Sequence, residues 1–262
     1  MTQHEFRDRI RVEIDGGVAR LVLARPDRRN ALDLDGAFAL RDAAELIVAA
    51  APRVVHVRSD GEAVFSVGGD LDAFAASDSP ARLVGDIAGG VHAAVVLLRE
   101  QRAPIVTEVA GVAAGGGFGL ALLGDIVLAG PGAWFRASYT AGGLSPDVGL
   151  TWLLRHLVGR PRAMDVVLTN RRISADEAAA WGLVSRVVAD DLAGAAAALV
   201  AELATGSRGA LSATRGLVEA AGNRSLADQL AAEQASISEL AGTVDGREGV
   251  RAFVDKRVPQ FP

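Results

Sequence analysis

The sequence predicts an α/β protein, with strands and helices alternating in the first half and helices predominating in the second. Short β-branched runs alternate with helical periodicity as far as about Pro146. The segment from Ala195 to Arg257 is rich in alanine and is typical of successive helices. Half of the 262 residues are apolar and 23% are charged, which is the balance of a folded globular protein.

The first half begins with two expected strands, at residues 9–14 and 18–23, joined by a turn at Asp15-Gly16-Gly17. Helical periodicity then runs from Asp33 to Ala50, and Pro52 ends it. The next expected elements are a strand at 54–57, a glycine loop at 65–70, a helix at 80–100, a strand at 105–109, a glycine-rich run at 111–119 that leads into a short helix ending at 123, and a strand at 126–129.

The second half has fewer strand signals. Ser174 and Glu177 have the spacing of a capping box, which predicts a short helix that begins there. A last short strand is expected at 184–188, followed by the helices of the C-terminal segment.

Composition excludes several kinds of site. The chain has no cysteine, which excludes disulfides, thiolate metal sites and a cysteine nucleophile. The four histidines lie far apart without ligand spacing, so we expect no metal site. A net charge of −5 argues against binding to nucleic acid. We find neither a signal peptide nor an apolar run of membrane-spanning length, and expect a cytoplasmic protein without membrane contact.

Two glycine clusters are candidates for chemistry. Gly115-Gly116-Gly117 lies between an expected strand and a helix but lacks the lysine and hydroxyl residue of a phosphate-binding P-loop. It could form an oxyanion hole, or simply allow close packing of the strand and the helix. The second pair, Gly68-Gly69, favours the oxyanion hole, because two such loops could direct two N–H groups at one oxygen.

Several motifs occur together and in a specific order. They are Arg25-Pro26 with Arg29-Asn30-Ala31-Leu32, Phe65-Ser-Val-Gly-Gly-Asp-Leu71, Ala103-Pro104-Ile105, Gly111-Val-Ala-Ala-Gly-Gly-Gly117, Val158-Gly-Arg160, Leu168-Thr-Asn170, Ile173-Ser-Ala-Asp-Glu-Ala178, Trp181-Gly-Leu-Val184 and Arg247-Glu-Gly-Val-Arg-Ala-Phe253. Through them the chain resembles the crotonase (enoyl-CoA hydratase/isomerase) family over nearly its whole length.

The resemblance implies the crotonase fold, a spiral of ββα units that forms two roughly perpendicular sheets. It implies a core at residues 1–195 with the coenzyme A and active sites. Residues 196–262 would form a helical region that builds a homotrimer or hexamer and caps coenzyme A. The implied partner is an acyl-CoA substrate, with coenzyme A as the thioester part and no permanently bound cofactor.

The resemblance also implies site residues. The N–H groups of Gly69 and Gly116 would hold the thioester oxygen and stabilise an enolate. The loop from Arg28 to Ala31 would lie near the adenine end of coenzyme A. Phe253 and Lys256 would contact the nucleotide from a neighbouring subunit, although spacing alone favours a solvated surface charge for Lys256. Further implied substrate-binding positions are Asp70, Leu71, Phe118, Tyr139 and Leu144. Of these, Phe118, Tyr139 and Leu144 are candidates for an apolar wall, as is Trp152, although each of the four could also be an ordinary core residue.

The chain departs from the hydratases of the family at two positions. Gly119 and Tyr139 stand where those enzymes have glutamates, so the usual two-carboxylate addition of water is in doubt. Asp147 is the remaining carboxylate in this neighbourhood. It could cap a helix that begins near 148–150, or it could point into the acyl pocket.

The region around Leu144-Ser-Pro-Asp147, together with the end of the chain, is most similar to the phenylacetate-pathway branch of ring-epoxide, oxepin-CoA and enoyl-CoA isomerases. The resemblance therefore implies a double-bond isomerase in which Asp147 removes a proton and returns it two carbons away.

Three alternatives remain open. One is hydration by an enoyl-CoA hydratase. Another is dehalogenation, since chlorobenzoyl-CoA dehalogenases have a nucleophilic aspartate at the position of Asp147, a histidine at His92 and a tryptophan at Tyr139. There His92 would activate water, whereas it could also be a solvated helix residue. The third is an acyl-CoA-binding protein without turnover.

Overall fold

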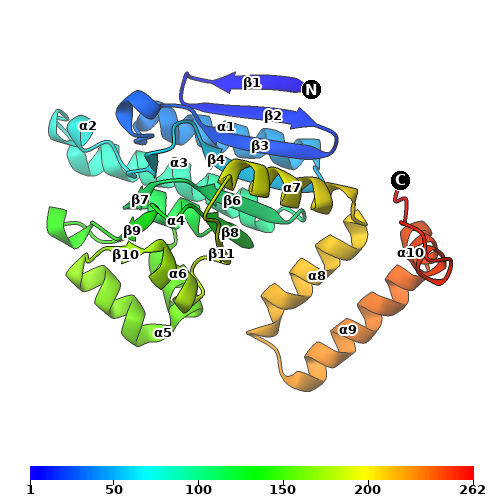
Figure 1. Ribbon diagram of the computed structural model, residues 1–262. Coiled ribbons are helices and arrows are strands. Elements are labelled where there is room, and N and C mark those ends of the chain that lie inside the picture. Colours follow the sequence, from blue (N-terminus) through cyan, green and yellow to red (C-terminus); the bar gives the residue numbers. More distant parts are fainter.

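The computed structural model describes all 262 residues, and its strands form two sheets (Figure 1). The 7-stranded sheet has the order β1-β2-β3-β4-β6-β8-β11, and the 4-stranded sheet has the order β10-β9-β7-β5. The strands are β1 (Thr2–Phe6), β2 (Ile10–Asp15), β3 (Val18–Leu23), β4 (Val54–Ser59), β5 (Val64–Ser66), β6 (Ile105–Val109), β7 (Val112–Ala114), β8 (Ile126–Ala129), β9 (Trp134–Arg136), β10 (Ile173–Ser174) and β11 (Arg186–Val187).

From β4 to β9, consecutive strands alternate between the two sheets, and helices connect β5 to β6 and β7 to β8. Strands β4, β6 and β8 lie in the larger sheet, while β5, β7 and β9 lie in the smaller one. The helices are η1 (Pro26–Arg28), α1 (Leu34–Ala50), α2 (Leu71–Ala75), α3 (Pro80–Glu100), α4 (Gly116–Ala121), η2 (Thr140–Gly142), α5 (Leu150–Thr169), α6 (Ala175–Trp181), α7 (Leu192–Thr205), α8 (Arg208–Ala221), α9 (Leu226–Ala241) and α10 (Val244–Val254). This repeat of two strands and a helix agrees with the predicted ββα spiral.

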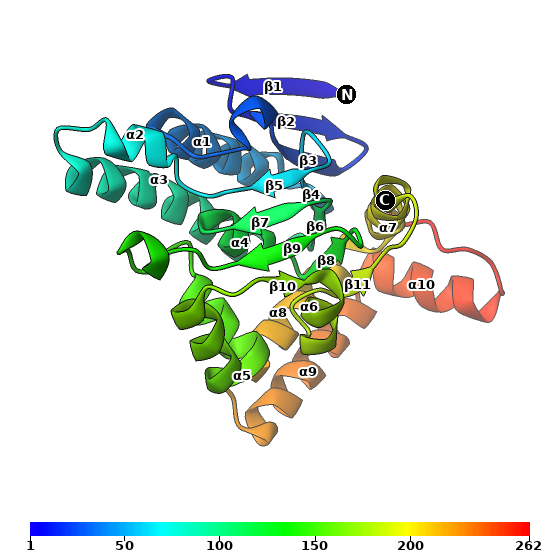
Figure 2. The same ribbon diagram turned by 60° about the vertical axis from the view of Figure 1, so that its left-hand side comes forward.

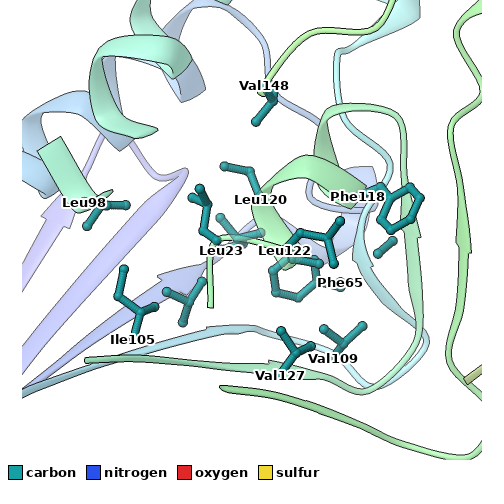
Figure 3. Close-up of a cluster of buried hydrophobic side chains, with 14 of the residues drawn as sticks. Leu23, Phe65, Leu98, Ile105, Val109, Phe118, Leu120, Leu122, Val127 and Val148 are labelled. Carbon is teal, nitrogen blue, oxygen red and sulfur yellow. The ribbon is translucent and has the colours of Figure 1, made fainter. Parts of the chain in front are cut away.

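The main core lies on one face of the larger sheet. It comprises 44 buried residues and includes residues of α1, α3 and α4. Phe65, Phe118, Leu120 and Leu122 gather around α4 in this core (Figure 3). A second cluster, which includes Ala196, joins α7 to the opposite face of the same sheet.

Several predicted elements are confirmed. The helix at 80–100 and the strands at 105–109 and 126–129 have the predicted bounds. Asp33 caps α1 by accepting a hydrogen bond from the Gly36 amide at 2.8 Å. Ser174 Oγ accepts one from the Glu177 amide at 3.2 Å, as the capping-box spacing predicts.

Other elements differ from the prediction. Strands β1, β7 and β9 were not expected, because β1 is polar and exposed and the other two have only three residues each. The glycine loop at 65–70 begins inside β5, and the strand expected at 184–188 shrinks to Arg186–Val187. Helix α7 spans the predicted boundary between 195 and 196 and packs on the sheet with the core.

The last three helices lie beside the body of the protein, with α8 and α9 running as an antiparallel pair below α7 (Figure 1). None of their residues is buried except Ala252 in α10. Helix α3 is long and apolar enough to span a membrane by length and composition. Its buried face, which includes Gly90, Val91 and Ala94, packs in the main core as expected of a core helix.

Candidate active site

A cavity of about 780 Å³ lies where the two glycine loops meet α2, α3 and the loop before α5. Its wall combines the backbone of Gly69 and Gly116 with apolar side chains and with Asp147. An apolar cavity of this size with a few convergent polar groups is typical of a small-molecule site.

The two glycine loops contact each other at the cavity. A Cβ atom at Gly68 would lie 2.4 Å from the amide nitrogen of Gly116, so no other residue fits there. Gly68 also has φ +82°, a conformation that favours glycine. A side chain at Gly117 would collide with the carbonyl oxygen of Ser66, at 2.2 Å. The close packing expected for a glycine run therefore occurs at the wall of the cavity.

The amides of Gly69 and Gly116 are placed to bind an oxyanion. Neither donates to any backbone hydrogen bond of the turns, loops and caps. Gly116 is the first residue of α4, where an N–H group has no partner within the helix. Both residues line the cavity, so the two predicted donors face the same space.

Asp147 points into this space beside Gly116. A Cβ atom at Gly116 would lie 3.7 Å from Asp147 Oδ1. The carboxylate does not cap α5, because Gly149 occupies the N-cap position and no backbone amide donates to the Asp147 side chain. Of the two roles considered for Asp147 from the sequence, the structure therefore corresponds to the pocket role.

Tyr139 holds one oxygen of that carboxylate. Its phenolic hydroxyl donates a hydrogen bond to Asp147 Oδ1, and the tyrosine side chain lines the cavity. Burial, followed by the negative charge of Asp147, raises the pKa of the Tyr139 phenol far above its usual range. The phenol is therefore a stable donor at neutral pH, and the second carboxylate oxygen has no protein donor.

The turn that follows Asp147 occupies the space that a side chain at position 119 would need. A Cβ atom at Gly119 would lie 2.7 Å from the carbonyl oxygen of Val148 and 2.9 Å from its Cβ. A glutamate at position 119, as in the hydratases of the family, is incompatible with this arrangement. The turn after Asp147 can therefore take this position only because residue 119 is glycine and not glutamate.

His92 lies on α3 outside the cavity lining and is exposed on one side. Its Nε2 accepts a hydrogen bond from the backbone amide of Val148 at 3.1 Å. This contact with the turn after Asp147 was not foreseen from the sequence, because the two residues are 56 positions apart.

The loop at Arg28 and the start of α2 form one end of the cavity. Arg28 donates to Asp72 at 3.0 Å, and Asp70 caps α2 by accepting from the Ala73 amide at 3.2 Å. Asp70 is also paired with Arg25, at 3.3 Å, so its charge is compensated. Four substrate-binding positions predicted there, Arg28, Ala31, Asp70 and Leu71, line the cavity, as does Leu144 near the Asp147 end.

Two predicted wall residues lie elsewhere. Phe118 is fully buried in the core, where its ring lies 5.3 Å from that of Phe135, because α4 turns this face away from the cavity. Trp152 is 52% exposed and stacks on His156. Helix α3 supplies the apolar wall instead, through Val84, Ile87, Ala88 and Val91. Their helical spacing is the signal that could have identified this wall from the sequence.

Phe253 and Lys256 are exposed and do not line the cavity of their own chain. Helix α10 lies at the opposite side of the molecule from α2 in both views (Figure 2). The structure contains no cluster of three or more side chains that could hold a metal ion.

Comparison with known proteins shows the family of the chain. The family pattern described as enoyl-CoA hydratase/isomerase matches residues 13–262. A Bacillus subtilis protein with the name of an enoyl-CoA hydratase/isomerase is 31% identical over 247 residues, 94% of this chain and 96% of its own. The Escherichia coli 1,2-epoxyphenylacetyl-CoA isomerase is 43% identical over 160 residues, 60% of this chain and 61% of its own.

The fold has close counterparts among solved structures. The crystal structure of an enoyl-CoA hydratase from Polaromonas sp. JS666 matches with a TM-score of 0.89 at 31% identity, covering 97% of this chain and 99% of the other. The α/β fold predicted from the sequence, with two sheets and C-terminal helices, is confirmed.

Proposed function

Since the chain belongs to the enoyl-CoA hydratase/isomerase family, we propose that it moves a double bond within an unsaturated acyl-CoA, with Asp147 as the proton carrier. The observation that carries this proposal is the carboxylate of Asp147 beside Gly116, in the cavity that the two free amides face. One base at this position suffices for isomerisation, because the acid formed in the first step is the donor in the second.

The proposed reaction has two proton transfers. The thioester oxygen binds between the amides of Gly69 and Gly116. The free oxygen of Asp147 removes a proton from the α carbon of a β,γ-unsaturated chain, and the two amides stabilise the resulting dienolate. Each such donor contributes about 3–4 kcal/mol in comparable sites. The protonated Asp147 then returns the proton to the γ carbon, which leaves the double bond conjugated with the thioester.

Tyr139 supports this role by fixing the base. Its hydroxyl occupies Oδ1, so that one defined oxygen remains for the substrate. Because the phenol pKa is raised, Tyr139 keeps its proton while Asp147 cycles between its two states.

The other activities considered from the sequence have less support. Hydration in the usual way needs two glutamates, and this chain has Gly119 and Tyr139 at those positions. Val148 also occupies the space that a side chain at position 119 would need. Activation of water by His92 would need its Nε2 lone pair, which the Val148 amide occupies. Binding without turnover would leave Asp147 as a helix cap, whereas its carboxylate faces the cavity.

The test is an ultraviolet assay on a β,γ-unsaturated acyl-CoA, with wild type beside Asp147→Asn. We expect the absorbance of the conjugated thioester to increase with the wild type. The rate of this increase should be about 100-fold or more lower with the variant, because the variant lacks the base. Calorimetric binding of a saturated acyl-CoA is expected to be similar for both proteins. An unchanged rate with the variant contradicts the proposal.

The control substrate is a conjugated enoyl-CoA. Loss of its absorbance would show that water is added, and would reject the isomerase in favour of a hydratase. The 1,2-epoxide of phenylacetyl-CoA belongs in the same panel, because the partial Escherichia coli relative carries the name of that isomerase.

A further inference from the structure

We propose that His92 is a positioning residue, which holds the turn at residues 147–149 so that the Asp147 carboxylate stays beside the oxyanion site. The contact that carries this is the 3.1 Å hydrogen bond from the Val148 amide to His92 Nε2. The expected effect on turnover rests on the proposed function, whereas the placement of the turn can be measured without it.

The turn needs external support because its backbone is strained. Val148 has φ +51°, a left-handed conformation that is an outlier for a β-branched residue. Gly149 follows with φ +70°. Such conformations persist only where the surroundings hold them, and they cluster at functional sites.

Two contacts hold Val148 from different directions. Its carbonyl oxygen and side chain pack against Gly119 of α4, and Val148 is only 2% exposed. Its amide donates to His92 of α3. His92 is the side chain that accepts the hydrogen bond of the Val148 amide, so it holds the backbone where the chain leaves Asp147.

Helix α3 makes His92 a rigid support. The helix has 21 residues, and the neighbouring Val91 is buried and lines the cavity. A shift of α3 would therefore move the apolar wall and the Asp147 turn together. His92 itself does not line the cavity, so any effect on the reaction passes through Val148.

The test compares His92→Phe, which keeps a ring without an acceptor, with His92→Gln, whose side-chain oxygen can accept. We expect kcat of His92→Phe to fall about 10-fold to 100-fold, as for displacement of a catalytic group by about 1 Å. KM should be little changed, because the acyl-CoA contacts remain. His92→Gln should recover most of the lost kcat. Should His92→Phe fail to fold, His92→Ala on this exposed helix surface replaces it.

A second readout follows the turn without any turnover. The chain has a single tyrosine, Tyr139, whose hydroxyl donates to Asp147. Displacement of Asp147 should lower the pH at which the tyrosine ionises, as measured by its ultraviolet difference spectrum. We expect this lower midpoint in His92→Phe and the wild-type midpoint in His92→Gln.

The outcomes separate the two proposals. A wild-type kcat and tyrosine midpoint in His92→Phe overturn the positioning role. A lower kcat with a wild-type midpoint also overturns it, since His92 would then act in another way. If the wild type shows no isomerisation, the proposed function fails, but a lower tyrosine midpoint in His92→Phe still supports the positioning role.

Discussion

Tyr139 is the residue at which the environment of the site can be measured most directly. Burial and the adjacent carboxylate both disfavour a phenolate, so we expect Tyr139 to ionise well above the usual value of about 10. As pH rises, the phenol keeps its proton through the range in which an exposed tyrosine loses it. Spectroscopic titration of the single tyrosine in the folded protein measures this directly.

Asp147→Asn separates the two causes of the raised pKa of Tyr139, which are burial and the charge of Asp147. The substitution removes the negative charge and leaves burial in place, so the midpoint should fall part of the way toward about 10. A midpoint in Asp147→Asn equal to that of the wild type would mean that the carboxylate does not contact the phenol in solution. A wild-type midpoint near 10 would mean that Tyr139 is solvated, and the described site would be wrong.

At the scale of elements, α4 and the turn before α5 fit together only because residue 119 is glycine. A methyl group there would overlap Val148, whose backbone carbonyl oxygen cannot rotate away as a side chain could. We expect Gly119→Ala to lose about 1–3 kcal/mol of unfolding free energy through overpacking, measured by urea denaturation. The isomerisation rate should also fall, because the turn carries Asp147.

Gly89→Ala is the matched control for this substitution. It lies within α3, and a Cβ atom there would meet nothing within 4 Å. Replacing a helical glycine at an open position by alanine should stabilise the protein by about 0.5–1 kcal/mol. Equal stability of Gly119→Ala and the wild type would show that the turn moves freely and would weaken the argument that the turn excludes a glutamate.

The sequence indicates elements well where local rules suffice. Periodicity predicted α1 and α3 close to their observed bounds, and the capping-box spacing identified the start of α6. Strands β7 and β9 were missed, because three-residue strands have too few residues to show alternation. Their order in the smaller sheet depends on partners that are distant in the sequence.

In the candidate site, too, the sequence predicted some residues from motifs but missed contacts that depend on the tertiary structure. Motifs predicted the two glycine donors and Asp147, which the structure brings to one cavity. The bond from Tyr139 to Asp147 and the contact of His92 with Val148 depend on the path of one strained turn. Phe118 lies in the core, which was the alternative to the cavity wall, and the sequence left both open because an apolar residue next to a glycine loop can face either side of a short helix.

At the scale of the whole molecule, the C-terminal helices leave several large apolar side chains exposed. Leu226, Ile237, Val250 and Phe253 are each more than 60% exposed on α9 and α10. Such surfaces mark sites of association between proteins. The resemblance to the crotonase family implies a homotrimer or hexamer, in which Lys256 would reach the coenzyme A site of a neighbouring subunit. Helix α10, which ends shortly before Lys256, lies on the opposite side of the molecule from α2 (Figure 2), and Lys256 does not line the cavity of its own chain.

Subunit mixing tests this arrangement. Lys256→Ala should raise KM and spare kcat, since the lysine would bind the nucleotide of the substrate without touching the reacting carbons. In mixed oligomers with Asp147→Asn, some sites would combine an intact Asp147 with an intact neighbouring Lys256. At low substrate concentration the mixture should therefore exceed the summed activities of the two separate variants. Light scattering should give about 81 kDa for three chains of 27.0 kDa, or about 162 kDa for six. Activity equal to the sum would mean that each site is complete within one chain, and the exposed Lys256 would then be an ordinary surface charge.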